Sequence, residues 1–202
     1  MIQEFIEFPK IFRLSRECII SEKIDGTNSQ IYITENKEFY AGSRNRYLTP
    51  ENDNHGFAKW AFEHKDELIE GLGIGRHFGE WWGAGIQRKY GLVNDDKRFS
   101  LFNTIRWCLH DSEPGIIKSQ NPIDPIKYQD RLPKCCGLVP ILYRGMFDTQ
   151  KVFEVLEDLK KNGSKAAPGF MKPEGIVVYH IAGNVGFKKT IEKDDEPKGK
   201  NR

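Results

Sequence analysis

The chain has 202 residues, of which 30% are charged and 38% hydrophobic, and its formal net charge is +2. This length fits one large domain or two small ones, and the composition is normal for a soluble globular protein with a core. The small net charge gives no general sign of nucleic-acid binding, and no segment approaches the roughly 20 apolar residues of a membrane span. The N-terminus lacks a signal-peptide pattern and the four cysteines lack a Cys-x-x-Cys spacing, so we expect reduced thiols and a cytoplasmic location.

The first half of the chain predicts a hairpin, a helix and two strands. Residues 18–42 form the hairpin, because an apolar run and two alternating runs are separated by turn residues. Apolar side chains recur at helical spacing from residue 56 to 69, and Gly71 and Gly73 end that helix. Residues 75–82 and 99–107 follow as strands.

A loop-rich segment at 111–140, which contains five prolines, separates these elements from the second half. A helix begins at Asp148 and runs to Lys161 with Gly163 as its stop, and its apolar face is formed by Val152, Phe153, Leu156 and Leu159.

The C-terminal part predicts two strands and a tail. A nearly continuous apolar strand spans 175–181, and a Gly-Asn turn leads into a basic strand at 185–188. Residues 192–202 are almost wholly charged and predict a flexible tail. Strands of mixed length with two helices indicate an α+β fold in one domain, residues 1–191.

The sequence Lys23-Ile24-Asp25-Gly26 lies between an apolar and an alternating run. This context predicts a strand, a tight turn and a strand, with Lys23 near the end of the first strand. A lysine held by a buried sheet beside backbone amides and other cations can lose its proton near neutral pH and become a nitrogen nucleophile. The alternative is an ordinary hairpin with an Asp-Gly turn and a solvated lysine.

Polar residues also follow or end several later strands, in a fixed order. These segments are Ser43-Arg44-Asn45-Arg46, Phe78-Gly79-Glu80-Trp81-Trp82, Phe99-Ser100-Leu101-Phe102-Asn103, Glu174-Gly175 and Phe187-Lys188-Lys189-Thr190. In the tryptophan pair, one ring is expected in the core and the other as an exposed platform for nucleic acid.

In this order the segments resemble the covalent nucleotidyltransferases, the superfamily of polynucleotide ligases and mRNA capping enzymes. Thr27-Asn28 after Gly26, the Phe-Gly-Glu at 78–80 and the spacing of Phe99 and Phe102 are similar to the RNA ligase 2-like branch of ATP-dependent RNA ligases. The resemblance implies an α+β, ATP-grasp-like adenylylation domain with mainly antiparallel sheets and flanking helices.

The resemblance also implies the activity. An ATP-dependent RNA ligase would join an RNA 5′-phosphate to a 3′-hydroxyl through a covalent lysyl-AMP intermediate, as in RNA repair. The alternatives are a DNA ligase, a capping-type guanylyltransferase, or a catalytically inactive nucleic-acid-binding relative. The expected partners are RNA ends, in a nicked duplex or a single strand, and no membrane. Since only about a dozen residues follow the basic strand, the catalytic domain itself, an oligomer or a helper protein would replace a missing C-terminal domain.

By the same resemblance, Lys23 is the nucleophile and Lys188 contacts the α-phosphate and keeps Lys23 uncharged by like-charge repulsion. Arg44 contacts ribose and phosphate, with Arg46 as an equal rival. Glu80 accepts hydrogen bonds from the ribose hydroxyls. Structural alternatives are a surface lysine at 188 and a surface glutamate at 80.

The remaining implied residues complete the nucleotide site. Phe102 stacks on adenine, although core packing is its alternative, and Glu174 holds the divalent metal, Mg²⁺ or Mn²⁺. Glu22, Asp25 and Gly26 belong to the cofactor-binding set.

Two positions depart from the family pattern. Thr190 replaces the second basic residue of the terminal motif, and Lys189 is a substitute that a regular strand would turn away from Lys188. Asn103 replaces the aspartate that often follows the aromatic motif.

Overall fold

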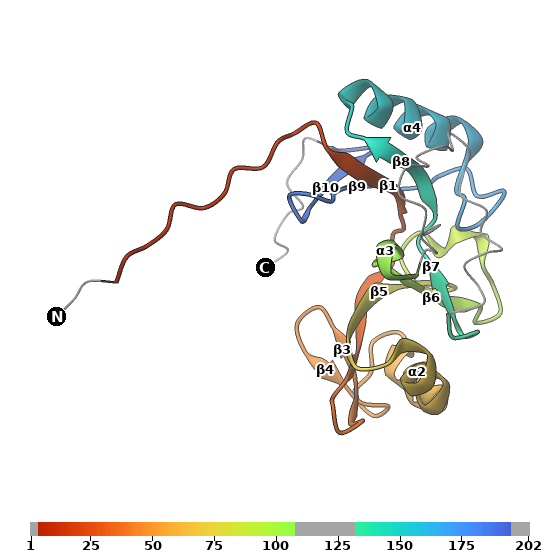
Figure 1. Cartoon of the computed structure of the whole chain (residues 1–202). Helices are drawn as coiled ribbons and strands as arrows, with labels where there is room; N and C mark the ends of the chain where they lie inside the picture. Colours follow the sequence, from red (N-terminus) through yellow and green to blue (C-terminus); the bar gives the residue numbers. More distant parts are fainter. Residues whose placement is uncertain (1–3, 108–131, 195–202) are drawn as a thin grey trace.

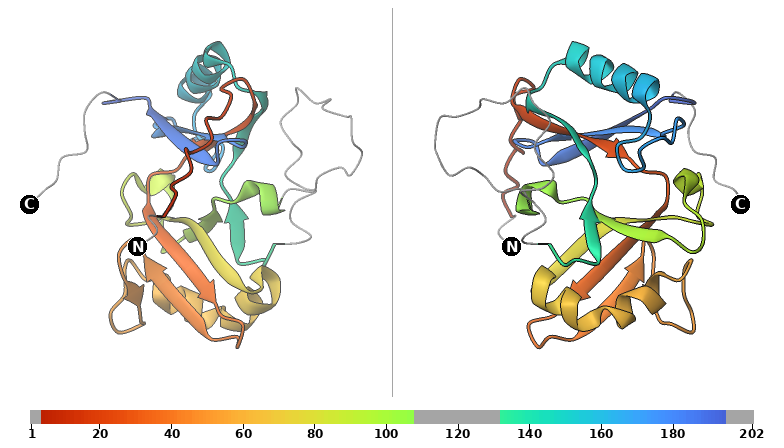
Figure 2. Two further views of the ribbon diagram at one scale, coloured as in Figure 1. Left: turned by 60° about the vertical axis from the view of Figure 1, so that its left-hand side comes forward. Right: turned by 90° about the vertical axis from the view of Figure 1, so that its right-hand side faces the viewer.

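The structure is a computed structural model that describes residues 4–107 and 132–194. Two sheets lie one above the other, and helices cover their outer sides (Figures 1 and 2). The four-stranded sheet has the order β10-β9-β1-β8, with β1 (Glu17–Lys23), β8 (Ile141–Met146), β9 (Gly175–His180) and β10 (Val185–Thr190).

The second sheet has six strands in the order β4-β3-β2-β5-β6-β7. Its members are β2 (Thr27–Ile33), β3 (Phe39–Ser43), β4 (Tyr47–Leu48), β5 (Gly75–Gly83), β6 (Lys97–Leu101) and β7 (Cys136–Leu138). Among these strand pairs, β6 and β7 are parallel and the others are antiparallel. The α+β fold with mainly antiparallel sheets is confirmed.

The hairpin predicted for residues 18–42 is wrong in its first half. Strands β2 and β3 pair as a hairpin, but β1 pairs with β8 and β9 in the other sheet. The reason is burial: Cys18, Ile19 and Ile20 are all at most 3% exposed, so both faces of β1 need cover and the strand takes a central position. Residues 24–26 therefore carry the chain from one sheet to the other.

Helix α4 (Thr149–Asn162) lies on the outer face of the four-stranded sheet (Figures 1 and 2). Asp148 caps it by accepting a hydrogen bond from the Gln150 backbone amide at 2.7 Å, and Gly163 ends it with φ of 77°. Both predicted ends are confirmed. The predicted apolar face is wrong at Phe153, which is 50% exposed, because it lies about 100° around the helix from buried Val152.

The helix predicted for 56–69 is two helices, α1 (Phe57–Glu63) and α2 (Lys65–Leu72), with a break at His64. Both pack on the six-stranded sheet.

The strand predicted for 99–107 ends at Leu101, and α3 (Thr104–Trp107) follows. Asn103 explains the change, because its side-chain oxygen accepts a hydrogen bond from the Arg106 amide, as an N-cap does.

The expected loop-rich segment at 111–140 contains β7, and β8 follows without having been predicted. Residues 108–131 and 195–202, which include most of the expected loop and tail, lie outside the described residues. Between β5 and β6 the chain forms a short 3-10 helix, η1 (Lys89–Gly91). Within the described ranges, no helix has the length and apolar character to cross a bilayer.

The expectation of one exposed tryptophan ring is also wrong. Trp81 and Trp82 are each 2% exposed. The two side chains point to opposite faces of β5, and each face is covered. The Trp81 indole donates to the His55 carbonyl, and the Trp82 indole donates to the Ser100 hydroxyl.

We predict that Leu159→Ala lowers the free energy of unfolding by about 2–5 kcal/mol, because Leu159 is 1% exposed between α4 and its sheet. Phe153→Ala on the same helix should cost less than about 1 kcal/mol, since half of that ring faces solvent. Urea denaturation of both variants measures the difference. Equal losses would contradict the packing of α4 described above.

Candidate active site

A cavity of about 910 Å³ opens between the two sheets, a size typical of small-molecule sites. The two strands that meet at the sheet crossover, β1 and β2, supply part of its wall, and β5, β6, β9 and β10 supply much of the rest. Eight of the nine sequence-predicted site residues line it: Glu22, Lys23, Asp25, Gly26, Arg44, Glu80, Phe102 and Lys188. Glu174 reaches the same place through its contact with Lys23.

Lys23 forms an ion pair with Glu174, with Nζ 2.6 Å from Oε2. Glu174 is 5% exposed and stands directly before β9, which pairs with β1 and so brings the two residues together across 151 positions. The side chain of Lys23 is 19% exposed, so the alternative of a solvated lysine in an ordinary turn is wrong. The amine is instead held at the end of β1, in the wall of the cavity.

Gly26 allows the crossover to lie directly against β5. A Cβ atom at this position would lie 2.4 Å from the Trp81 carbonyl oxygen and 2.8 Å from the Trp82 Cβ, which no larger residue could tolerate. The close approach lets the Gly26 amide donate to the Glu80 carboxylate at 3.0 Å. The glycine of the Lys-x-Asp-Gly sequence is thus explained by contact.

Glu80 is 7% exposed, and its second oxygen accepts a hydrogen bond from the Asn28 side chain at 3.0 Å. Burial raises the pKa of Glu80 to about 7 from its ordinary 4.5, although the bond from the Gly26 amide, the charge of Lys23 and the bond from Asn28 lower it. The register pairs Asn28 with Glu80, so both side chains project from the same face of the sheet. Asn28 was not predicted as a site residue, and its position two residues after Gly26 was the available signal.

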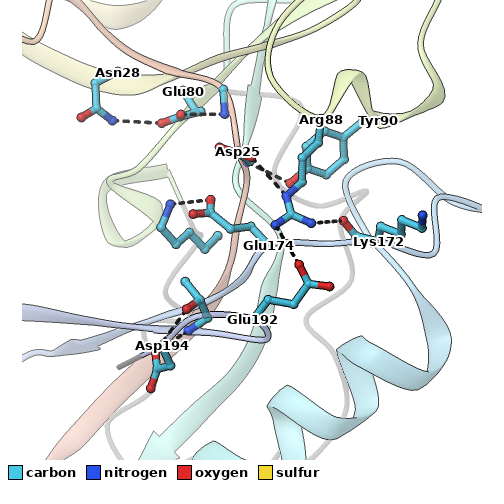
Figure 3. A network of polar contacts seen from close by, with 12 residues as sticks. Asp25, Asn28, Glu80, Arg88, Tyr90, Lys172, Glu174, Glu192 and Asp194 are labelled. Atoms are coloured by element: carbon cyan, nitrogen blue, oxygen red, sulfur yellow. Dashed lines mark hydrogen bonds and ion pairs between the residues drawn. The ribbon is translucent and has the colours of Figure 1, made fainter. Parts of the chain in front are cut away.

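Arg88 connects three segments of the site (Figure 3). Its guanidinium donates to Asp25 at 3.1 Å and to the Lys172 carbonyl at 3.1 Å, and it lies 3.9 Å from a carboxylate oxygen of Glu192. Asp25 belongs to the crossover, Lys172 precedes Glu174, and Glu192 follows β10. This role could not be predicted from the sequence, because Arg88 and Lys89 resemble an ordinary solvated pair.

Tyr90 also supports the crossover. It is 2% exposed, and its hydroxyl accepts a hydrogen bond from the Asp25 amide at 2.8 Å. Burial raises the pKa of Tyr90 above its ordinary value of 10. Tyr90 therefore stays a neutral phenol beside the Asp25 carboxylate.

The basic strand β10 divides its two lysines between the two sides of the sheet. Lys188 pairs with Val177 and lines the cavity. Lys189 points to the α4 side, where it forms an ion pair with Asp194 at 2.8 Å and lies 5.2 Å from the Phe153 ring. Thr190 also bonds Asp194. Neither Lys189 nor Thr190 supplies a second cation to the cavity.

Arg44 and Arg46 are separated in a similar way. Arg44 lines the cavity, whereas the guanidinium of Arg46 donates to the carbonyls of Asn52 and Asp53 at 3.1 and 3.4 Å. Arg46 therefore holds a loop, and Arg44 faces the cavity.

Phe102 and Glu22 also differ in exposure. Phe102 is 42% exposed in the cavity wall, so core packing does not explain it.

Glu22 is 1% exposed and accepts hydrogen bonds from the Ser164 hydroxyl and from the amides of Lys165 and Ala166. Burial raises the pKa of Glu22 above its ordinary value, and those hydrogen bonds offset only part of the rise. Its carboxylate ties the loop after α4 to β1, and both oxygens are engaged there.

The carboxylates of the cavity suit a metal ion that takes its remaining ligands from phosphate and water. Within residues 4–107 and 132–194, no three His, Cys, Asp or Glu side chains are grouped closely enough to form a protein cage for a metal ion. Mg²⁺ is commonly held by one or two carboxylates together with phosphate oxygens and water. Glu174 beside a cavity of this size fits that arrangement.

Comparisons with known proteins point to one family. The sequence model of the RNA ligase family matches residues 16–193. No curated protein sequence matches the chain.

Solved structures of the RNA ligase from Naegleria gruberi share the fold. An arginine-to-alanine variant with ATP and Mn matches with a TM-score of 0.60 and 19% identity, over 89% of this chain and 51% of that one. A lysine-to-methionine variant with AMP and Mn matches with a TM-score of 0.58 and 18% identity, over 88% and 50%. The chain thus spans about half the length of these ligases.

We predict that Glu80 makes the stability of the protein fall as pH rises from 4.5 to about 7. Its pKa is raised in the folded state, so the folded protein binds more protons than the unfolded chain between pH 4.5 and about 7. The wild type should therefore lose roughly 3 kcal/mol relative to Glu80→Gln over this interval. Denaturation of both proteins at several pH values isolates this contribution, because Glu22 is common to both. A constant difference would contradict the buried environment of Glu80.

Proposed function

Because the chain belongs to the RNA ligase family, we propose that it is an ATP-dependent RNA ligase that forms a lysyl-AMP on Lys23. The observation that carries this proposal is the position of Lys23. Its amine is held by Glu174 at the end of β1, inside a cavity large enough for a nucleotide. An ion pair with a single carboxylate also gives the amine a fixed direction.

In the first step, the Lys23 amine attacks the α-phosphorus of ATP. A nitrogen–phosphorus bond forms, the bond to pyrophosphate breaks, and its electron pair leaves with pyrophosphate. The amine must be uncharged for this attack, so it leaves its ion pair with Glu174 and its proton passes to water in the open cavity. Positioning and charge neutralisation provide most of the catalysis in such transfers.

The cavity supplies these groups from known elements. Lys188 faces it from β10 and would contact the α-phosphate, while its charge disfavours a proton on Lys23. Arg44 would bind ribose and phosphate, Phe102 would stack on adenine, and Glu80 would accept from the ribose hydroxyls. Asp25, Gly26 and Glu22 would act indirectly, by holding the crossover and β1 in place.

Glu174 would hold the divalent metal, Mg²⁺ or Mn²⁺, once it has released Lys23. Such an ion supplies positive charge that neutralises phosphate oxygens. The Naegleria ligase structures contain Mn with ATP or AMP, which supports the same pairing here.

Two further transfers complete the proposed reaction. AMP passes from Lys23 to an RNA 5′-phosphate, and a 3′-hydroxyl then attacks that phosphate and releases AMP. We assign these steps to residues 1–191 as the adenylylation domain, alone or with a helper protein or a second copy.

The free thiols of Cys18, Cys135 and Cys136 support a reducing, cytoplasmic setting.

We predict that the purified protein gains one AMP when it is incubated with ATP and Mg²⁺, and that pyrophosphate removes it. Lys23→Ala and Lys23→Arg should both lose this mass increment. Arginine keeps a cation beside Glu174 but is not a nucleophile, because its guanidinium stays protonated. Intact-protein mass spectrometry measures the increment, and GTP serves as the control for capping activity. An increment in either variant would refute the proposed nucleophile.

We also predict that two neighbouring lysines differ in effect. Lys188→Ala should slow adenylylation by at least about tenfold, as the loss of a charge contact to a reacting phosphate does. Lys189→Ala should leave the rate within about twofold, because Lys189 lies on the α4 side with Asp194. Single-turnover labelling with α-labelled ATP compares the two. Equal effects would argue against Lys188 as the phosphate contact.

A further inference from the structure

The cavity face of the six-stranded sheet continues beyond the nucleotide site as a row of exposed aromatic side chains. Side chains on one face alternate along each strand, so the pairs Asn28–Glu80, Gln30–Phe78 and Tyr32–Arg76 follow one another on β2 and β5. The third pair lies four residues from the first, or about 13 Å along the strands. Tyr40 pairs with Tyr32 on this same face.

We call Tyr32, Tyr40, Tyr47 and Arg76 the tyrosine–arginine strip. The Tyr32 and Tyr40 rings are stacked with centroids 5.9 Å apart, and the Tyr40 and Tyr47 centroids are 5.3 Å apart. The Arg76 guanidinium lies 3.9 Å from the centre of the Tyr32 ring and donates to the Tyr47 hydroxyl. The strip is therefore one connected surface.

The strip is open to solvent and positively charged. Tyr40 is 37% exposed and Tyr47 49% exposed. In the described part of the chain, Arg76 takes part in no ion pair, so its charge is not neutralised by a carboxylate. Glu38, two residues before Tyr40, is hydrogen-bonded to Thr34.

The strip reaches the nucleotide site through Arg76, which lines the larger cavity, and a second cavity adjoins that one. It has a volume of about 450 Å³ and shares Asn28, Arg44, Phe78 and Phe102 with the larger cavity. Gln30, which also lines it, accepts a hydrogen bond from Arg76. A strand whose end lies near Lys23 can therefore pass over Phe78, which is 51% exposed, to reach the tyrosines.

We propose that the strip binds the unpaired bases of the RNA strand whose end is being joined, a claim that rests on the ligase function proposed above. Unpaired bases present flat faces that stack on tyrosine rings and on arginine, and a positive groove follows the phosphates. A duplex hides those faces and offers phosphates and groove edges. The strip therefore favours a single-stranded RNA end over a fully paired nick as the substrate.

The test compares a double variant, Tyr40→Ala with Tyr47→Ala, with the control Phe62→Ala. Phe62 is 37% exposed, as Tyr40 is, but it belongs to α1 on the opposite face of the sheet. The probes are a fluorescent 5′-phosphorylated single-stranded RNA and a nicked RNA duplex, and binding is measured by anisotropy without ATP. Each lost ring should weaken single-strand binding at least about fivefold, with little change for the duplex or for Phe62→Ala.

Retained single-strand affinity in the double variant, or an equal loss on the nicked duplex, would overturn the proposal. Tyr40→Phe keeps the ring and should bind as the wild type does. If the double variant does not fold, crosslinking of the wild type to 4-thiouridine RNA decides, because crosslinks away from the strip would equally reject it. A failure of the ligase function is seen separately, as an absence of lysyl-AMP on the wild type.

Discussion

The chain leaves the four-stranded sheet and enters the six-stranded sheet within three residues, Ile24, Asp25 and Gly26, and the whole site depends on how closely this crossover is held. Ile24 is buried with Trp82, Tyr90 and Val139, so apolar contacts fix it from inside. Asp25 is bonded through its amide to Tyr90 and through its carboxylate to Arg88. Lys23, immediately before the crossover, has little freedom to move away from the cavity.

The same region concentrates carboxylates in a buried place. Glu22, Glu80 and Glu174 are each at most 7% exposed, which is costly unless the groups are hydrogen-bonded or paired. In the described chain, no buried side-chain nitrogen or oxygen lacks a hydrogen-bond partner. The partners differ in kind: backbone amides hold Glu22, an amide and Asn28 hold Glu80, and a cation holds Glu174. Of the three, Glu174 is therefore the one that is paired with the lysine we propose as the nucleophile.

Local patterns in the sequence predicted what depends on local physics. The caps of α4, the turn between β9 and β10 and the strand end at Lys23 follow from residues close together in the chain. Pairing was less accessible, because β1 meets β8 more than 100 residues later, and Arg88 meets Asp25 across 63 positions. The tryptophan pair shows the same limit. Strand alternation places Trp81 and Trp82 on opposite faces, but it does not show that Ile24 and Tyr90 cover Trp82.

The register of β2 against β5 is what relates the proposed nucleotide site to the tyrosine–arginine strip. Asn28 and Glu80, Gln30 and Phe78, and Tyr32 and Arg76 share a face because each pair is two residues from the next. A slip of one residue in β2 would exchange Asn28, Gln30 and Tyr32 for Ser29, Ile31 and Ile33. These three are buried, and the two isoleucines share a core with α1 and α2. The packing of the core on one face thereby fixes the order of polar and aromatic groups on the other. A single hydrophobic alternation thus places the proposed nucleotide contacts of β2 and β5 and the proposed RNA-binding strip on one face of the sheet.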